Sequence, residues 1–263
     1  MTWDYLFLLG SSGLFVGLIY VFPLSNSHSH DRNHPTTILQ RLISTSSGCL
    51  IVAMFLNFFV ADDALYRYLW MNIDVNAVYG VGYSLIITCI LFFGPIFTEI
   101  VIERRLPFQF DLTDSDSVAL ENLRDLILAP FLEEFMFRGC FLAFCSEARG
   151  WSYLQRLWVI PLFFSAAHAH HVISNPSKWQ ITLFQCVYTY IFGVYATFIL
   201  LVTRSLWAAV FAHMLCNALG LPPFLDHLFL TYKRKPKMLL LIRLAYVVGL
   251  ALFLGVAAVS ARV

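Results

Sequence analysis

Long apolar runs recur along the whole chain, and short polar stretches separate them. A run of about twenty apolar residues can cross a bilayer as an α-helix, whereas a transmembrane β-barrel would show alternating segments of about ten residues. The pattern predicts an all-α, polytopic integral membrane bundle that forms one domain over residues 1–263. The eight predicted membrane helices are Tyr5–Leu24, Leu42–Val60, Val78–Ile100, Leu123–Cys145, Leu157–Ile173, Ile181–Val202, Leu206–Leu221 and Met238–Val259.

Composition supports a membrane protein. The chain is 59% hydrophobic and 13% charged, whereas a soluble domain carries about a quarter charged residues. The net charge of +1 gives no reason to expect a nucleic-acid partner. The six cysteines lack the paired spacing of zinc or redox motifs, so we expect small buried hydrophobes. Residues 1–23 contain Asp4 but no Lys or Arg, which predicts a retained first span rather than a cleavable signal peptide.

The distribution of Lys and Arg among the loops predicts the orientation, because cytosolic loops are enriched in both. One set of alternate loops is about twice as basic as the other, and we expect it in the cytosol, with both chain ends on the opposite side. The more basic set comprises Arg32, Arg41, Arg104, Arg105, Arg124, Lys178, Lys233, Arg234, Lys235 and Lys237. The other set comprises Arg67, Arg149, Arg156, Arg204 and Arg262.

Three of the predicted helices each contain a cluster of polar residues. A charged side chain near the bilayer centre costs roughly 2.5–3.5 kcal/mol, so ionisable residues inside a membrane indicate function. The clusters are Glu133-Glu134 with Arg138, Phe164 with His168, and His213 with Asn217. Together they supply carboxylates, imidazoles and a carboxamide, which are the groups of a water-activating site.

The two glutamates of the first cluster are neighbours in the sequence and therefore lie on different faces of the helix. Residues four apart share a helix face, so Glu134 and Arg138 are expected to form an ion pair. Glu133 faces the side of Pro130 and Phe137 and has no local cation, which makes it the candidate general base. The alternative is that both glutamates pair with basic residues of other helices.

The other two clusters add imidazoles and an amide. Small residues before His168 allow close helix packing and favour it as the buried histidine, whereas His170 and His171 are expected nearer the membrane surface. His213 and Asn217 are four residues apart and can both donate hydrogen bonds to an oxyanion. The alternative for this last pair is hydrogen bonding between spans.

The predicted orientation places the clusters at similar depths. At about 1.5 Å per residue, Glu133 lies roughly 15 Å, His168 roughly 8 Å and His213 roughly 12 Å from the cytosolic ends of their helices. The chain contains neither Gly-x-Ser-x-Gly nor His-Glu-x-x-His. Two histidines and a glutamate from separate helices could still hold a metal ion, but the additional donor Asn217 favours a site without metal or cofactor.

The same residues resemble the CPBP family of intramembrane proteases, in particular its type II CAAX prenyl endopeptidases, the Ras-converting enzymes. That family's pattern is Glu-Glu-x-x-x-Arg, Phe-x-x-x-His and His-x-x-x-Asn. Residues 123–130 (LRDLILAP) and Phe93-Gly94-Pro95 are also similar to the eukaryotic branch. The resemblance covers about residues 92–220.

The resemblance implies a multi-pass protease of the endoplasmic-reticulum membrane, with an active site open to the cytosol. Its substrates would be prenylated CAAX proteins such as Ras-type small GTPases, which lose their C-terminal aaX tripeptide. Glu133 and His168 would activate water, and His213 with Asn217 would form the oxyanion hole. Glu134, Arg138 and Phe164 would support the site, and no covalent intermediate is expected.

Other functions remain open at this stage. A related protease could cleave membrane peptides without a prenyl group, a transporter could use the buried Glu and His residues as a proton relay, and a scaffold could retain the fold without catalysis. The acidic residues Asp111, Asp114, Asp116 and Glu121 could attract the polybasic region of a prenylated protein or simply form a solvated loop.

Overall fold

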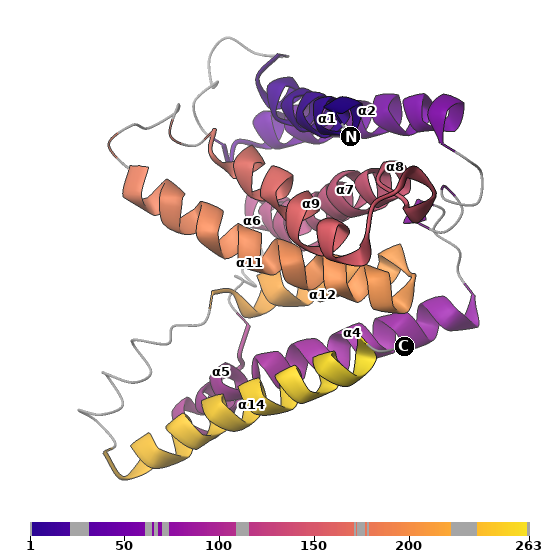
Figure 1. The fold of residues 1–263 in the computed structure, drawn as a ribbon. Coiled ribbons are helices and arrows are strands. Elements are labelled where there is room, and N and C mark those ends of the chain that lie inside the picture. The colour runs from indigo at the N-terminus through magenta and orange to yellow at the C-terminus, as the bar shows by residue number, and fades with distance from the viewer. Residues whose placement is uncertain are drawn as a thin grey trace.

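The computed structural model describes residues 2–21, 32–60, 65, 68–69, 74–108, 116–170, 172, 177, 179–221 and 236–261. Every regular element in these ranges is helical, as predicted (Figure 1). The longer helices are α1 (Thr2–Val21), α2 (Pro35–Phe59), α4 (Val75–Leu91), α9 (Tyr153–His168), α11 (Trp179–Thr203), α12 (Leu206–Leu219) and α14 (Leu239–Ser260). Shorter elements are α5 (Phe93–Phe97), η1 (Thr98–Glu103), α6 (Asp116–Leu123), η2 (Arg124–Leu128), α7 (Ala129–Glu134), η3 (Phe135–Cys140), α8 (Phe141–Phe144), η4 (Glu147–Arg149) and η6 (Pro236–Met238).

Fewer helices are long and apolar enough to cross a membrane than the eight predicted. Within the described ranges, four helical stretches qualify: Thr2–Tyr20, Pro35–Phe59, Trp179–Thr203 and Pro236–Ser260. A fifth span results if α4 and the following α5–η1 stretch, bent by 69°, count as one. The other predicted segments are helical but short or interrupted: α9 contains Pro161, the stretch from α6 to α8 contains Pro130, and α12 has only 14 residues. The protein is therefore a multi-pass membrane protein.

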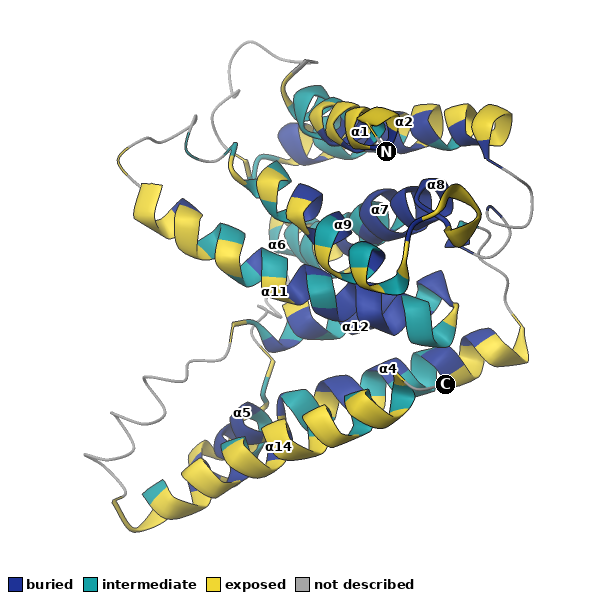
Figure 2. Cartoon of the chain, in the orientation of Figure 1, coloured by how far each residue is buried: buried dark blue, intermediate teal, exposed yellow. Residues whose placement is uncertain are grey.

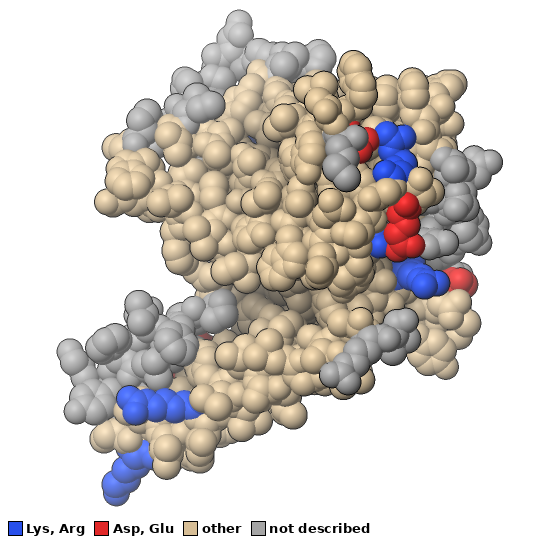
Figure 3. Space-filling model, in the orientation of Figure 1, with Lys and Arg blue, Asp and Glu red and all other residues tan. Residues whose placement is uncertain are grey.

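Burial is distributed as expected for helices surrounded by lipid. Figure 2 shows α12 largely buried, whereas α14 turns a mostly exposed face outward. Exposed large apolar side chains are numerous on the outer helices; Phe58 of α2, for example, is 81% exposed. On the face drawn in Figure 3, charged side chains gather near the α8–α9 connection and near the start of α14, with a broad uncharged surface between them. That uncharged band suits the hydrocarbon region of a bilayer.

The helical stretch from α6 to α8 is widened by two π-helical segments. Pro130 lies just after the first of these, η2, and has no N–H to donate. Its ring also conflicts with the carbonyl group four residues earlier, at Leu126, so the regular α-helical bonding is interrupted there. The second, η3, contains Arg138. Such π-helical turns are frequent at functional sites, because they redirect neighbouring side chains.

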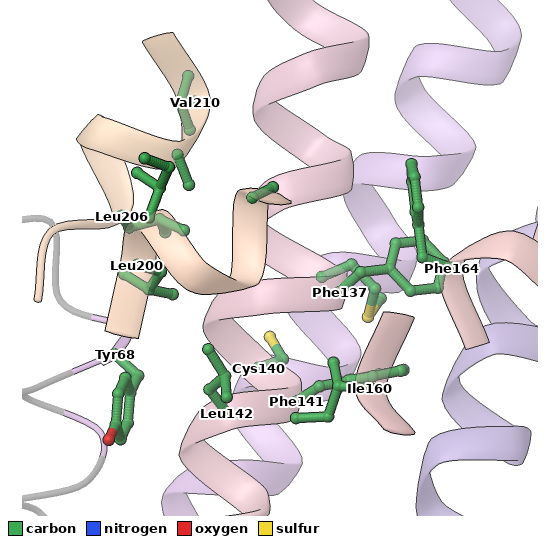
Figure 4. Packing of buried hydrophobic residues seen from close by; sticks show 14 of the residues in the cluster. Tyr68, Phe137, Cys140, Phe141, Leu142, Ile160, Phe164, Leu200, Leu206 and Val210 are labelled. Carbon is green, nitrogen blue, oxygen red and sulfur yellow. The ribbon is translucent and has the colours of Figure 1, made fainter. Parts of the chain in front are cut away.

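The core between these helices is aromatic. Phe137 and Phe141 of η3 and α8 pack edge to face at 5.4 Å, and Phe137 meets Phe164 of α9 at 5.2 Å (Figure 4). Helices α9 and α11 approach closely at Gly193, where an added Cβ would lie 2.9 Å from Cβ of Pro161. The missing side chain at Gly193 therefore lets α11 pack against the helix that contains His168.

Candidate active site

A buried ion pair occupies the centre of the candidate site. Nη1 of Arg138 lies 3.1 Å from Oε1 of Glu134, and neither side chain is exposed. The spacing of these two residues predicts this contact. The same Oε1 atom lies 2.8 Å from Nδ1 of His213 on α12, a contact that the sequence did not indicate. One carboxylate oxygen thus joins two of the three polar clusters.

Glu133 lies on another face and lines a cleft. Its side chain is 24% exposed, and its Oε2 atom lies 3.9 Å from Nε2 of His213. That distance is too long for a hydrogen bond. Glu133, Phe137 and His168 all line a cleft of about 260 Å³ between α1, α2, α7 and α9. The structure therefore brings the glutamate and the histidine of the predicted water-activating pair to one cavity.

The backbone orients the ring of His168. Its Nδ1 atom lies 2.9 Å from the carbonyl oxygen of Phe164, one turn earlier on α9. Because a carbonyl oxygen only accepts hydrogen bonds, Nδ1 carries the hydrogen. In the neutral ring Nε2 is then the acceptor, which is the form a general base requires.

Aromatic rings separate and support these polar groups. The guanidinium carbon of Arg138 lies 4.2 Å from the ring centre of Phe164, a cation–π distance. Phe164 also packs against His168, with ring centres 4.8 Å apart. On the other side, the ring of Phe192 lies 4.5 Å from that of His213.

Asn217 lies one turn after His213 on α12 and is exposed. Its Nδ2 atom donates to the backbone carbonyl oxygen of Asp125 at 2.9 Å. An amide nitrogen carries two hydrogens, so this bond uses one and leaves another for a ligand. Asp125 itself lines the cleft that contains Glu133. The hydrogen bond therefore ties the Asn217 amide to a residue of the cleft, although Asn217 itself is not one of the residues that line it.

Two cavities of different polarity flank the cluster. The cleft with Glu133 and His168 is also lined by three arginines, Arg32, Arg41 and Arg124. A second cavity of about 460 Å³ lies beyond Phe192, between α4, α11, α12 and α14. Its lining is apolar and aromatic and includes Tyr188, Tyr195, Cys216 and Tyr246.

Sequence reasoning missed several residues of the cleft. His170 lines it, a role that the sequence did not assign to it; α9 ends at His168, so helical periodicity no longer places the residues that follow. The three arginines were considered only as signs of orientation. His171, Asp111 and Asp114 lie outside the described residues.

Within the described ranges, no three His, Cys, Asp or Glu side chains converge in a way that could hold a metal ion. The absence of a metal requirement stays a prediction.

Comparison with known proteins identifies the family in which this pattern of candidate site residues occurs. A profile of the Rce1-like type II CAAX prenyl endopeptidases matches residues 116–219, which include all seven candidate site residues. The probable CAAX prenyl protease 2 of Schizosaccharomyces pombe is 30% identical over 221 residues, which cover 80% of this chain and 78% of the relative. The chain belongs to the Rce1-like CAAX prenyl endopeptidase family. As a member of this family it is a protease.

Two further relatives extend the similarity over nearly the whole chain. The CAAX prenyl protease 2 of Caenorhabditis elegans is 28% identical and covers 93% of this chain and 94% of the relative. The human CAAX prenyl protease 2 is 27% identical and covers 91% of this chain and 75% of the relative. No solved structure matches the chain.

Proposed function

We propose that this protease removes the C-terminal aaX tripeptide from prenylated CAAX proteins such as Ras-type small GTPases. The observation that carries the proposal is the common cleft of Glu133 and His168, next to the buried unit of Glu134, Arg138 and His213. This arrangement supplies a base, a water-positioning group and hydrogen-bond donors from three helices. Membership of the prenyl endopeptidase family supplies the substrate class.

In the proposed reaction, water attacks the carbonyl carbon of the prenylated cysteine. Glu133 accepts a proton from this water, and the acceptor nitrogen of His168 holds the water in place. The C–N bond then breaks, and the proton passes from Glu133 to the leaving amine. Water attacks directly, so no bond forms between enzyme and substrate.

His213 and Asn217 are proposed to stabilise the oxyanion. Nε2 of His213 faces Glu133, and the second hydrogen of Asn217 Nδ2 is available beside Asp125, which lines the cleft. Donors held in place before reaction stabilise developing negative charge without the cost of reorganisation. Glu134, Arg138 and Phe164 hold His213 and the surrounding helices in position.

The two cavities fit the two parts of such a substrate. A prenylated C-terminus has a lipid on one side of the scissile bond and a charged carboxylate on the other. The apolar cavity and the arginine-lined cleft lie on opposite sides of the candidate site. A protease for unmodified membrane peptides would have less need for this difference in polarity.

We further propose an endoplasmic-reticulum location, with the cleft open to the cytosol and all eight apolar segments within the membrane. The three arginines of the cleft belong to the more basic of the two sets, which supports this orientation. Prenylated substrates would reach the cleft from the cytosolic leaflet, because their lipid already partitions into the bilayer at about 0.8 kcal/mol per buried CH₂.

The proposal is tested by tripeptide release from a farnesylated CAAX peptide, with purified wild type and Glu133→Gln in detergent and metal content measured in parallel. Wild type should release the tripeptide, and the variant should lose essentially all activity. Glu103→Gln, at an exposed glutamate at the end of η1, is the matched control and should remain active. A folded wild type that releases nothing would contradict the function. Stoichiometric bound zinc would preserve a protease but overturn the proposed mechanism.

A further inference from the structure

Three arginines line the cleft of Glu133 and His168, and the proposed chemistry does not use them. Arg124 is engaged with the protein: its Nε and Nη2 atoms lie 2.6 and 2.8 Å from the two carboxylate oxygens of Asp125. Its Nη1 atom donates to the backbone carbonyl of Arg32 at 3.0 Å. Arg124 therefore fixes the residues that precede α2 against η2.

Arg41 differs from Arg124. Its side chain is half-buried in the cleft, at the start of α2, and forms no ion pair with any carboxylate among the described residues. The charged groups that act on it include two further cations, Arg32 and Arg124. Asp125 and Glu133 also line the cleft, but Asp125 is paired with Arg124. A partly desolvated guanidinium beside like charges is costly unless it binds an anion, and its planar donors match a carboxylate.

The position of Arg41 along α2 gives a distance from the scissile bond. Sγ of Cys49 lies 3.7 Å from the carbonyl oxygen of Leu132, so Cys49 marks the level of the neighbouring Glu133 on α2. Arg41 precedes Cys49 by eight residues, or about 12 Å of helix. Three extended residues span about 10 Å. If a peptide is cleaved beside Glu133, the third residue after the scissile bond would therefore have its C-terminal carboxylate within reach of Arg41.

We propose that Arg41, with Arg32 beside it, binds the C-terminal α-carboxylate of the substrate. This inference rests on the proposed function. It implies that the cleft accommodates three substrate residues between the scissile bond and the C-terminus of the substrate. Arg41 would thus be a specificity-determining residue. It lies outside residues 116–219, the part that matches the family profile.

The test compares two farnesylated peptides that differ only at the C-terminus, one with a free carboxylate and one with a carboxamide. Wild type in neutral detergent should cleave the acid at least tenfold better in kcat/KM, as expected for a hydrogen-bonded charge. In Arg41→Gln, kcat/KM for the carboxylate peptide should fall by that factor, and kcat/KM for the carboxamide peptide should stay unchanged. The ratio of the two values should then approach one. Arg41→Lys should retain part of the preference, because it keeps the charge but not the planar donors.

Arg105→Gln is the matched control. Arg105 pairs with Glu99, a hydrogen bond that raises the pKa of Arg105, and its side chain is 66% exposed outside the cleft. This variant should keep the wild-type ratio.

Equal losses for both peptides in Arg41→Gln would show a merely structural role and overturn the inference. Equal cleavage of both peptides by wild type would also overturn it and would assign the arginines to another anion, such as a lipid phosphate. A wild type that cleaves neither peptide would contradict the proposed function, and this inference with it.

Discussion

Nδ1 of His213 lies 2.8 Å from Oε1 of Glu134, so a buried carboxylate orients the histidine. Glu134 also pairs with Arg138, so its Oε1 atom acts as the acceptor and the hydrogen of this contact lies on Nδ1 of His213. The neutral ring then has no hydrogen on Nε2, the atom that faces Glu133. His213 can donate to an oxyanion through Nε2 only as an imidazolium, whose positive charge Glu134 would balance.

We therefore expect Glu134→Gln to impair catalysis and also to lower stability, because the buried charge of Arg138 loses its counter-charge. The amide oxygen can still accept from Nδ1, but the negative charge that supports the imidazolium is lost. Tripeptide release should fall in kcat by roughly a hundredfold, the order seen when one oxyanion donor is removed. Steady-state kinetics with a farnesylated peptide, alongside a thermal melt, measure both effects.

Glu134→Ala is the informative comparison, because it also removes the side-chain oxygen that glutamine would still offer to Nδ1 of His213. Breaking a buried pair in this way costs about 3–5 kcal/mol, so this variant should be markedly less stable as well as inactive. A Glu134→Gln enzyme with wild-type kcat would show that His213 needs no charged partner.

Asn217→Ala should lower kcat by about 10²–10³ if the amide donates to the oxyanion. Its hydrogen bond to Asp125 is exposed, so its loss should cost no more than about 1 kcal/mol of stability. Asn217→Asp should be at least as defective, because a carboxylate cannot donate and repels the oxyanion. If Asn217 only joins α12 to η2, both variants would melt earlier but retain kcat in the remaining folded fraction.

The sequence predicted the elements and the polar residues better than their detailed contacts. Glu134 and Arg138 are four apart on one helix, so local geometry determines their contact. The meeting of Glu134 with His213 depends on the packing of α7 against α12, which no local spacing encodes. Arg41 was overlooked because a charge at the start of a span is usually a sign of orientation.

The span count differs from the prediction for a related reason. Hydropathy recognises an apolar run, but α9 and α12 have 16 and 14 residues and contain site residues. Helices that contain an active site contact other helices more than lipid, so their length and composition are less constrained by the bilayer.

Neutralising α6 should weaken the recognition of polybasic substrates. Asp116 and Glu121 lie on this helix, which has no buried residue. With Asp116→Asn and Glu121→Gln together, KM for a peptide with a lysine-rich segment should rise about threefold at low salt. The difference should vanish at about 1 M salt, where the screening length is about 3 Å. A neutral peptide serves as the control. If the salt dependence of KM for the polybasic peptide is unchanged, α6 is simply a solvated surface.

Gly193→Ala should destabilise the site through packing alone. The new Cβ would lie 2.9 Å from Cβ of Pro161 and 3.4 Å from Nη2 of Arg138, so α9 and α11 would have to separate. Overpacking of this kind costs about 1–3 kcal/mol and would shift the helix that contains His168. Thermal unfolding in detergent and tripeptide release should both decrease.

Gly255→Ala in α14 is the matched control, because nothing lies within 4 Å of its added Cβ. This substitution should leave activity unchanged and stability unchanged or slightly higher, since alanine favours helix by about 1 kcal/mol. Equal melting temperatures for the two variants would mean that α9 and α11 leave room for a side chain at residue 193. The site would then not depend on this contact for its geometry.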